Sequence, residues 1–169
     1  MAALKMSDGL AEGAQLGASV SRKERDKIAQ LVDQAVASGA TLHLGGVTPE
    51  GEGAFYPATV LSVASDNPIL AQEVFGPVAP IVTFGSDEEA IALANATEYG
   101  LIAYVYSTDL KRAIRASEAI EAGMVAINRG VISDPAAPFG GVKQSGLGRE
   151  GGFAGIHEFL ETKYIGVEI

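Results

Sequence analysis

The alternation of short apolar runs with segments of helical periodicity constrains the fold most strongly. The apolar runs have the length of strands, and we predict strands at 41–44, 56–63, 78–84, 101–106 and 124–127. Helices are predicted before and between them, at 22–38, 87–95 and 109–123. Strands that alternate with helices of this length pair in parallel through crossover connections. The sequence therefore predicts the α/β class, with a mostly parallel open sheet and flanking helices.

Local signals mark the ends of two of these helices. In the first helix, apolar residues recur at helical spacing and form one stripe: Ile28, Leu31, Val32, Ala35 and Val36. Gly39 ends that helix, because glycine readily adopts the left-handed conformation at a helix C-terminus. Ser86 and Glu89 predict a capping box at the start of the second helix. There the hydroxyl accepts from a later backbone N–H, and the carboxylate accepts from an earlier one.

The segment 138–152 differs from the rest because it is rich in glycine. Its backbone can approach another group closely, so we interpret it as a functional loop. The G-x-G-x-x-G pattern at 146–151 lacks the preceding strand, long helix and later acidic residue of a dinucleotide-binding fingerprint. A loop at 47–54, a short helix at 155–162 and a final strand at 163–169 complete the prediction. That strand lacks local partners, and we expect it to pair with another chain or with another part of its own protein.

The net charge and the lack of cysteine exclude several function classes. A formal net charge of -9 argues against sequence-independent binding to nucleic acid or anionic lipid, because both need a basic surface. Without cysteine the chain has no disulfide, thiolate metal site or cysteine nucleophile. We interpret His43 and His157 as structural and predict no metal site. No apolar run approaches the roughly 20 residues of a membrane span, so we expect a cytoplasmic protein with no nucleic-acid and no membrane partner.

Two longer motifs carry a stronger signal when they are taken together. The first is Glu73-Val-Phe-Gly-Pro-Val78, and the second is Pro138-Phe-Gly-Gly-Val-Lys-Gln-Ser-Gly-Leu-Gly-Arg-Glu150. Both resemble signatures of the aldehyde dehydrogenase superfamily. Other short segments follow in the family's order and spacing: Asp8-Gly9, Gly45-Gly46, 55–60, 95–101 and Gly123-Met124. The resemblance covers nearly the whole chain and is to the C-terminal half of such an enzyme.

Within the superfamily, the segments 130–133 and 158–164 are most similar to succinate-semialdehyde dehydrogenases. The resemblance implies that residues 1–160 form the C-terminal part of the catalytic domain and that residues 161–169 form an oligomerisation strand. It also implies a homo-oligomer, a small aldehyde as substrate and NAD or NADP as cofactor. In the full-length enzyme, the reaction would oxidise succinate semialdehyde to succinate.

Four residues match binding positions of the family. Glu73 corresponds to a glutamate that bonds the hydroxyls of the nicotinamide ribose, and Phe75 to a phenylalanine that packs beside the nicotinamide. Phe139 corresponds to an aromatic residue of the substrate tunnel, and Ser133 to a serine that helps to hold the substrate carboxylate. Structural interpretations stay open beside these: a surface carboxylate at a turn for Glu73, core packing for Phe139 and a turn residue for Ser133.

The chain departs from the family pattern in its chemistry. The family's reaction begins when a cysteine thiolate attacks the aldehyde carbonyl. That cysteine, the glutamate base, the oxyanion-hole asparagine and the Rossmann half are absent from this sequence, so no catalytic residue is predicted. We expect the chain alone to be inactive and to bind no cofactor tightly. The alternative is a non-catalytic interaction module that pairs with itself or with a full-length relative through its final strand.

Overall fold

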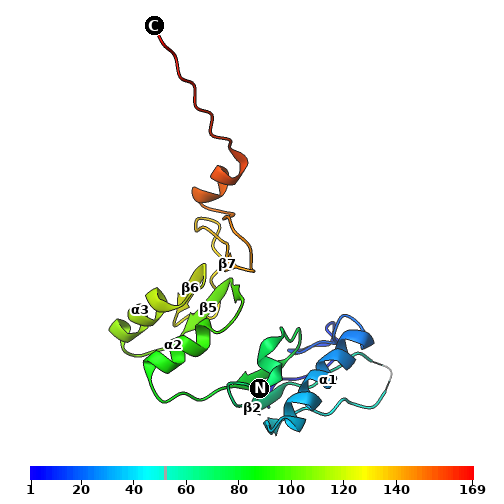
Figure 1. Cartoon of the computed structure of the whole chain (residues 1–169). Coiled ribbons are helices and arrows are strands. Elements are labelled where there is room, and N and C mark those ends of the chain that lie inside the picture. Colours follow the sequence, from blue (N-terminus) through cyan, green and yellow to red (C-terminus); the bar gives the residue numbers. More distant parts are fainter. Residues whose placement is uncertain (52) are drawn as a thin grey trace. The chain divides into compact units, whose positions relative to one another are not determined.

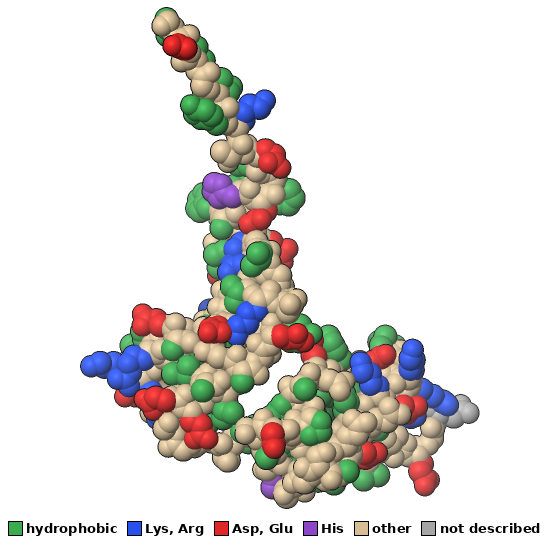
Figure 2. Space-filling model, in the orientation of Figure 1, with side chains coloured by type: hydrophobic (Ala, Val, Ile, Leu, Met, Phe, Trp, Pro, Cys, Tyr) green, Lys and Arg blue, Asp and Glu red, His purple; other side chains and the backbone are tan. Residues whose placement is uncertain are grey.

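The computed structural model describes residues 1–51 and 53–169, so residue 52 of the predicted loop 47–54 lies outside the described residues. The described chain falls into two units, Met1–Phe84 and Gly85–Ile169 (Figure 1). Acidic and basic side chains are interspersed over the face seen in Figure 2. None of the helices in the described ranges has both the length and the apolar character that crossing a bilayer requires.

The first unit combines one long helix with a three-stranded sheet. In chain order it contains α1 (Arg22–Ala37), β1 (Thr41–Leu44), β2 (Thr59–Ser62), the 3-10 helix η1 (Pro68–Ala71) and β3 (Val78–Ile81). β2 lies in the middle of the sheet and pairs antiparallel with β1 and parallel with β3. Among the described residues between β1 and β2 there is no helix, and a direct return of the chain produces antiparallel pairing.

α1 forms where the sequence predicts it because both of its ends are capped. Ser21 Oγ accepts a hydrogen bond from Glu24 N at 3.2 Å. At the other end Gly39 has a φ of 91°, and its N–H donates to Val36 O at 3.0 Å. The predicted apolar stripe is buried at four of its positions: Ile28, Leu31, Val32 and Ala35.

The core of the first unit joins α1 to the sheet and to η1. Its buried residues come from all three: Ile28, Val32, Ala35, Ala40, Tyr56, Leu61, Val63 and Ile69. Asn67, which is also buried, fastens η1 to α1. Its Nδ2 donates to Ala35 O at 3.1 Å, and its Oδ1 accepts from Ile69 N at 3.2 Å. Both ends of the amide are satisfied, so its burial costs little, and the chain enters η1 from a fixed point.

The second unit is built around two parallel strands joined by a helix. In chain order it contains α2 (Asp87–Asn95), β4 (Tyr99–Gly100), β5 (Ile102–Val105), α3 (Leu110–Ala119), β6 (Met124–Ile127), β7 (Val142–Lys143) and the 3-10 helix η2 (Ala154–Phe159). β5 and β6 pair in parallel over their whole length, and α3 packs against both (Figure 1). β4 and β7 form a separate antiparallel pair.

Polar contacts fix α2 beside α3. The predicted capping box of α2 is confirmed: Ser86 Oγ accepts from Glu89 N at 3.2 Å, and Glu89 Oε2 accepts from Gly85 N at 2.6 Å. Arg112 of α3 forms an ion pair with Asp87 of α2. Asn95 Nδ2, at the end of α2, donates to Ala119 O at 2.9 Å. These contacts hold both helices at their two ends.

Backbone packs directly on backbone in the glycine-rich segment 138–152. A Cβ added at Gly123 would collide with the carbonyl oxygen of Gly140, and one added at Gly140 would collide with the carbonyl oxygen of Gly148. The guanidinium of Arg149 donates to Gly141 O at 2.8 Å and to Gly148 O at 2.7 Å. The glycines therefore allow a close approach that no other residue would permit.

The sheet arrangement differs from the single open sheet that the sequence predicts. Within the described residues the strands form three small sheets, although the mixed α/β composition and the parallel pairs β2–β3 and β5–β6 agree with the predicted class. The predicted strand 56–63 is shortened to 59–62, since Pro57 has no N–H to donate to a ladder. The predicted strand 78–84 is likewise shortened to 78–81.

The C-terminal end also differs from the prediction. The predicted short helix at 155–162 is the 3-10 helix η2 over 154–159. Residues 163–169, predicted as a strand, have no secondary structure and are exposed in the single chain. A strand needs a neighbour for its hydrogen bonds, and this segment has none among the residues described.

Leu61 gives a test of the first core, because none of its side chain is exposed. Leu61→Ala is expected to lower the free energy of unfolding by about 2–5 kcal/mol, since it removes buried methyl groups and leaves a cavity. The measurement is urea denaturation of the full chain followed by circular dichroism. Leu10→Ala is the control, because Leu10 is 99% exposed. Equal unfolding midpoints for the two variants would show that Leu61 lies outside the core.

Gly123 gives a test of the backbone contact in the second unit. The methyl group of Gly123→Ala would collide with Gly140 O, and a backbone carbonyl cannot move away as a flexible side chain can. We expect faster amide hydrogen exchange at Phe139 and Glu150, which bond each other next to this contact. Gly9→Ala is the matched control, since nothing lies within 4 Å of an added Cβ there. Unchanged exchange in Gly123→Ala would exclude the close approach.

Candidate functional site

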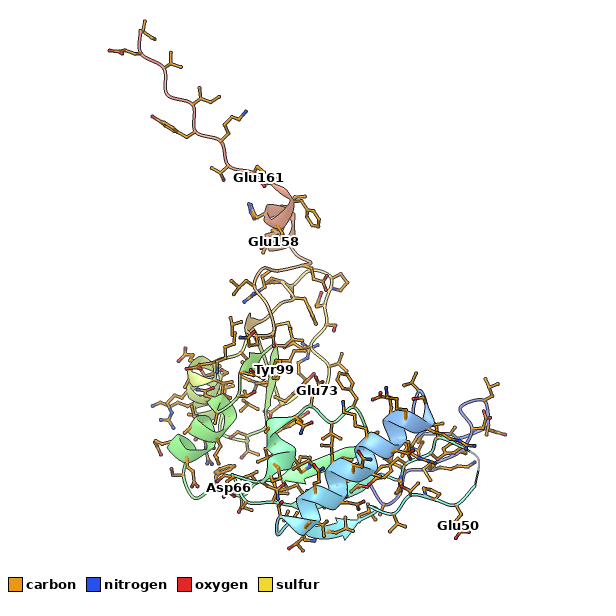
Figure 3. The ribbon with its side chains drawn as sticks, turned by 45° about the vertical axis from the view of Figure 1, so that its right-hand side comes forward. Glu50, Asp66, Glu73, Tyr99, Glu158 and Glu161 are labelled. Carbon is orange, nitrogen blue, oxygen red and sulfur yellow. The ribbon has the colours of Figure 1, made fainter. Side chains whose placement is uncertain are left out.

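Glu73 and Phe75 lie on the segment between η1 and β3, where Figure 3 labels Glu73. Val74, between them, packs against the core of the first unit. Glu73 is exposed, and Phe75 is 74% exposed. One side chain thus anchors the segment while its two neighbours remain accessible. An exposed ring beside an exposed carboxylate can contact a ligand or another protein surface without any change in the core.

The backbone that follows Phe75 is held from two sides. A Cβ added at Gly76 would lie 2.5 Å from the Cδ1 atom of Ile28, so the segment rests directly on α1. Pro77 O accepts a hydrogen bond from the N–H of the buried Thr59 at 2.8 Å, which joins the segment to β2. Glu73 and Phe75 are therefore carried by a loop that the sheet and the helix hold in place.

Phe139 opens the glycine-rich segment in the second unit. Its N–H donates to Glu150 O at 2.7 Å, and its carbonyl accepts from Glu150 N at 2.8 Å. The half-buried ring lines a cleft of about 240 Å³. The cleft has a mixed polar and apolar lining, formed by Gly123, Met124, Val125, Ile132, Asp134, Ala137, Pro138 and Phe139. Phe139 thus faces a cleft, and core packing does not account for its whole surface.

Ser133 lies six residues after the end of β6 and is exposed, while its neighbours Ile132 and Asp134 line the same cleft as Phe139. A turn follows at once, in which Asp134 Oδ1 accepts from Ala136 N at 2.9 Å. Ser133 and Phe139 therefore both lie in the second unit, on two segments that line one cleft. Glu73 and Phe75 share a segment of the first unit.

Two residues that position the loops of the second unit were not predicted from the sequence. Arg149, described above, clamps the glycine-rich segment, and Asn128 fixes the start of the loop that carries Ser133. Asn128 has a φ of 53°, and its carboxamide binds both backbone groups of Ser107. The sequence holds a signal for each role. Arg149 is a long cationic side chain among glycines, where it can donate to exposed backbone carbonyls. Asn128 follows a strand, and asparagine tolerates the left-handed conformation of a turn.

The two histidines lie away from these loops. His43 Nε2 lies 2.7 Å from Ser62 Oγ, across the β1–β2 pair, and His157 is exposed on η2. The contact of His43 agrees with its structural interpretation. Among residues 1–51 and 53–169, no three side chains of the histidine, aspartate or glutamate type gather closely enough to hold a metal ion.

Comparison with known proteins identifies the family. Residues 1–165 match the model of the Aldehyde dehydrogenase family. The chain is 52% identical over 168 residues to the succinate-semialdehyde dehydrogenase of Paenarthrobacter nicotinovorans, covering 99% of this chain and 37% of that protein. It is 42% identical to the glutarate-semialdehyde dehydrogenase of Pseudomonas putida, covering 100% of this chain and 35% of the relative.

Solved structures of aldehyde dehydrogenases are also similar to this chain in fold and sequence. The succinate-semialdehyde dehydrogenase of Burkholderia pseudomallei superimposes with a TM-score of 0.88 at 46% identity, over 94% of this chain and 33% of that one. A betaine aldehyde dehydrogenase of Staphylococcus aureus, solved in complex with NAD+, gives a TM-score of 0.89 at 38% identity, over 96% of this chain and 33% of that one. The chain thus spans about a third of the length of the proteins that it matches. It belongs to the aldehyde dehydrogenase family.

Proposed function

We propose that this chain forms the C-terminal part of an NAD(P)-dependent aldehyde dehydrogenase that oxidises succinate semialdehyde to succinate. The observation that carries the proposal is the continuous 52% identity to a succinate-semialdehyde dehydrogenase over 99% of the chain. The accessibility of the predicted site residues supports it, because Glu73, Phe75 and Ser133 are all exposed on loops. Exposed side chains on anchored backbone are suited to contacts with a ligand or with the rest of an enzyme.

Glu73 and Phe75 are the residues that would hold the nicotinamide cofactor. A carboxylate can accept hydrogen bonds from two neighbouring ribose hydroxyls, and an apolar ring can limit the motion of the nicotinamide. The geometry fits this role, because the core contact of Val74 and the contact of Gly76 with Ile28 fix the backbone on both sides of Phe75. When bound, the cofactor supplies the hydride acceptor of the reaction.

Phe139 and Ser133 are the residues proposed for the substrate. The ring of Phe139 lines a cleft, where it can pack against the hydrocarbon part of a small aldehyde. The Ser133 hydroxyl can donate to a carboxylate without adding charge. Succinate and glutarate semialdehydes differ by one methylene, which a binding pocket distinguishes by only about 1–3 kcal/mol. The relatives include a succinate-semialdehyde and a glutarate-semialdehyde dehydrogenase, so the choice between these two substrates is the most detailed claim of the proposal.

The chain alone does not hold the group that attacks the aldehyde. Its sequence has no cysteine, and the family's reaction requires a thiolate. We therefore propose that the isolated chain is inactive and that a second protein part supplies the cysteine, the base and the Rossmann half. The same part would supply further strands, so that the parallel pairs β2–β3 and β5–β6 become pieces of the predicted open sheet.

A chimera tests this assignment. In the chimera, the full 169-residue chain replaces the matching part of the Paenarthrobacter nicotinovorans enzyme, which leaves the rest of that relative in place. With succinate semialdehyde and NAD or NADP, we expect absorbance of reduced cofactor to appear with the chimera and not with the chain alone. Turnover by the isolated chain would refute the proposal. A folded chimera without turnover would refute it as well.

Glu73→Gln in the same chimera tests the cofactor residue. Replacing the carboxylate weakens two charge-assisted hydrogen bonds, and the KM for the cofactor is expected to rise about 10-fold or more, while the KM for the aldehyde stays within twofold. Glu118→Gln, at an exposed carboxylate of α3, is the matched control. If both variants keep the parent KM, Glu73 is a surface carboxylate and not a cofactor ligand.

We also propose that residues 161–169 are an oligomerisation strand separate from the body 1–160. The segment 153–169 exposes large apolar side chains over its whole length: Phe153, Ile156, Phe159, Leu160, Tyr164, Ile165, Val167 and Ile169. Hydrophobic side chains are visible along it in Figure 2. Unpaired backbone and exposed apolar side chains favour pairing with a strand of another copy. The same observation favours the alternative, in which the chain is a non-catalytic interaction module.

Truncation after Leu160 tests the strand. We expect the full chain to form a homo-oligomer by light scattering and the truncated chain to be a monomer, because the truncation removes the segment that pairs. The full chain with Leu10→Ala serves as the control for a change in exposed apolar surface elsewhere. Equal masses of the full and the truncated chains would refute the role of 161–169. A full chain that oligomerises while the chimera lacks turnover would favour the interaction module.

A further inference from the structure

The two units of the chain differ in their apolar cores. In the first unit, the cluster of buried residues described above includes large side chains such as Tyr56, Leu61 and Val32. In the described part of the second unit, the buried apolar side chains are those of Ala113 and Ala126. A buried alanine removes much less apolar surface from water than a buried leucine or tyrosine. Hydrophobic burial therefore stabilises the first unit far more than the second.

The elements of the second unit are also too short to be stable by themselves. α2 has 9 residues and α3 has 10, whereas isolated helices of fewer than about 12–15 residues are marginal in water. Within α2, whose residues are all described, no side chain is buried. β5 and β6 form a sheet of two strands, and two strands without further partners are at best marginally stable. The stability of this unit therefore depends on what packs against it.

The ion pairs of the second unit do not replace a core. Arg112 and Asp87 join α3 to α2, and both side chains are partly exposed to water. Lys143 Nζ lies 2.6 Å from Glu121 Oε2, and this pair is partly exposed as well. Exposed ion pairs add little stability, because water screens the charges and the long side chains lose conformational freedom. These contacts fix how the elements are arranged, but they leave the unit easy to open.

Large apolar side chains of the second unit are exposed near the start of α3. Tyr106 follows β5, and Leu110 is the first residue of α3; both line one cleft of about 570 Å³ and are 66% exposed. Ile114 lies one helical turn after Leu110 and is also exposed. We define these three residues as the α3 apolar surface. Adjacent exposed apolar side chains of this kind favour burial against another protein surface.

We propose that the second unit is stably folded only when the remaining part of the enzyme covers the α3 apolar surface. The inference rests on the proposed function, and it names the part of this chain whose folding depends on the missing part. Parallel strands occur in sheets that are covered on both faces, so the β5–β6 pair requires further strands and side chains. The chain spans about a third of its relatives, and the rest of such an enzyme is large enough to supply them.

Hydrogen exchange followed by mass spectrometry tests the inference on the full 169-residue chain and on the chimera described above. In the chain alone, we expect protection factors about 100-fold lower for the backbone amides of α3 than for those of α1, because α3 opens without unfolding of the first core. In the chimera, the protection of α3 is expected to rise about 100-fold. Leu61→Ala in the chain alone is expected to lower the protection of α1 and to leave that of α3 unchanged.

Leu110→Gln tests the α3 apolar surface itself. Glutamine has nearly the helix propensity of leucine, so this change removes apolar surface without weakening the helix. The protection of α3 is expected to stay the same in the chain alone, where Leu110 is exposed, and to fall about 10-fold in the chimera, where Leu110 is covered. Leu10→Gln, at an exposed leucine of the first unit, is the matched control and is expected to change neither. Unchanged protection in the Leu110→Gln chimera overturns the role of this surface.

The other outcomes separate the inference from the proposed function. Equal protection of α1 and α3 in the chain alone, or equal losses in both after Leu61→Ala, would show one cooperative unit and overturn the inference. Protection of α3 that rises with the concentration of the chain alone would make a second copy the occupant and overturn it as well. A chimera that turns over but leaves α3 unprotected overturns the inference alone. Protection of α3 in a chimera without turnover supports the inference and refutes the proposed activity.

Discussion

The absence of a side chain at a few glycines is the constraint on which both candidate loops depend. At Gly76 it allows the segment with Glu73 and Phe75 to lie on Ile28 of α1. At Gly140 it allows the chain next to Phe139 to lie against the backbone of Gly148. In both places the neighbouring functional side chain sits on backbone that cannot be displaced cheaply, because the contact beneath it is already at van der Waals distance. The position of each candidate loop thus depends on glycines, whose missing Cβ allows the backbone to pack closely.

The exposed apolar surface agrees with the proposal that this chain forms part of a larger enzyme. Large apolar residues remain exposed in both units, for example Phe75, Tyr106 and Phe159. Single exposed apolar residues are ordinary on protein surfaces, but here Phe75 lies on a loop that carries proposed binding residues, and Phe159 lies beside the unpaired C-terminal segment. The chain also spans only about a third of the length of the relatives that it matches, which independently supports the same proposal.

Local features of the fold could be predicted from the sequence, and features that depend on distant partners could not. α1, α2 and β6 agree with the prediction because caps and periodicity are encoded within a few residues. β4 and β7 were missed, since each has only two residues and its partner lies more than 40 positions away. The four site residues came from the family motifs. Their exposure, and the clamping role of Arg149, required the three-dimensional arrangement.

The carboxamide of Asn128 has a consequence for the durability of the protein. It binds a backbone donor and a backbone acceptor of Ser107 at once, through its oxygen and its nitrogen. Spontaneous hydrolysis of that amide would leave a carboxylate, and its second oxygen would then face the carbonyl oxygen of Ser107 with no proton between them. Slow chemical ageing at one atom would release the end of β6 and every residue that the following loop carries.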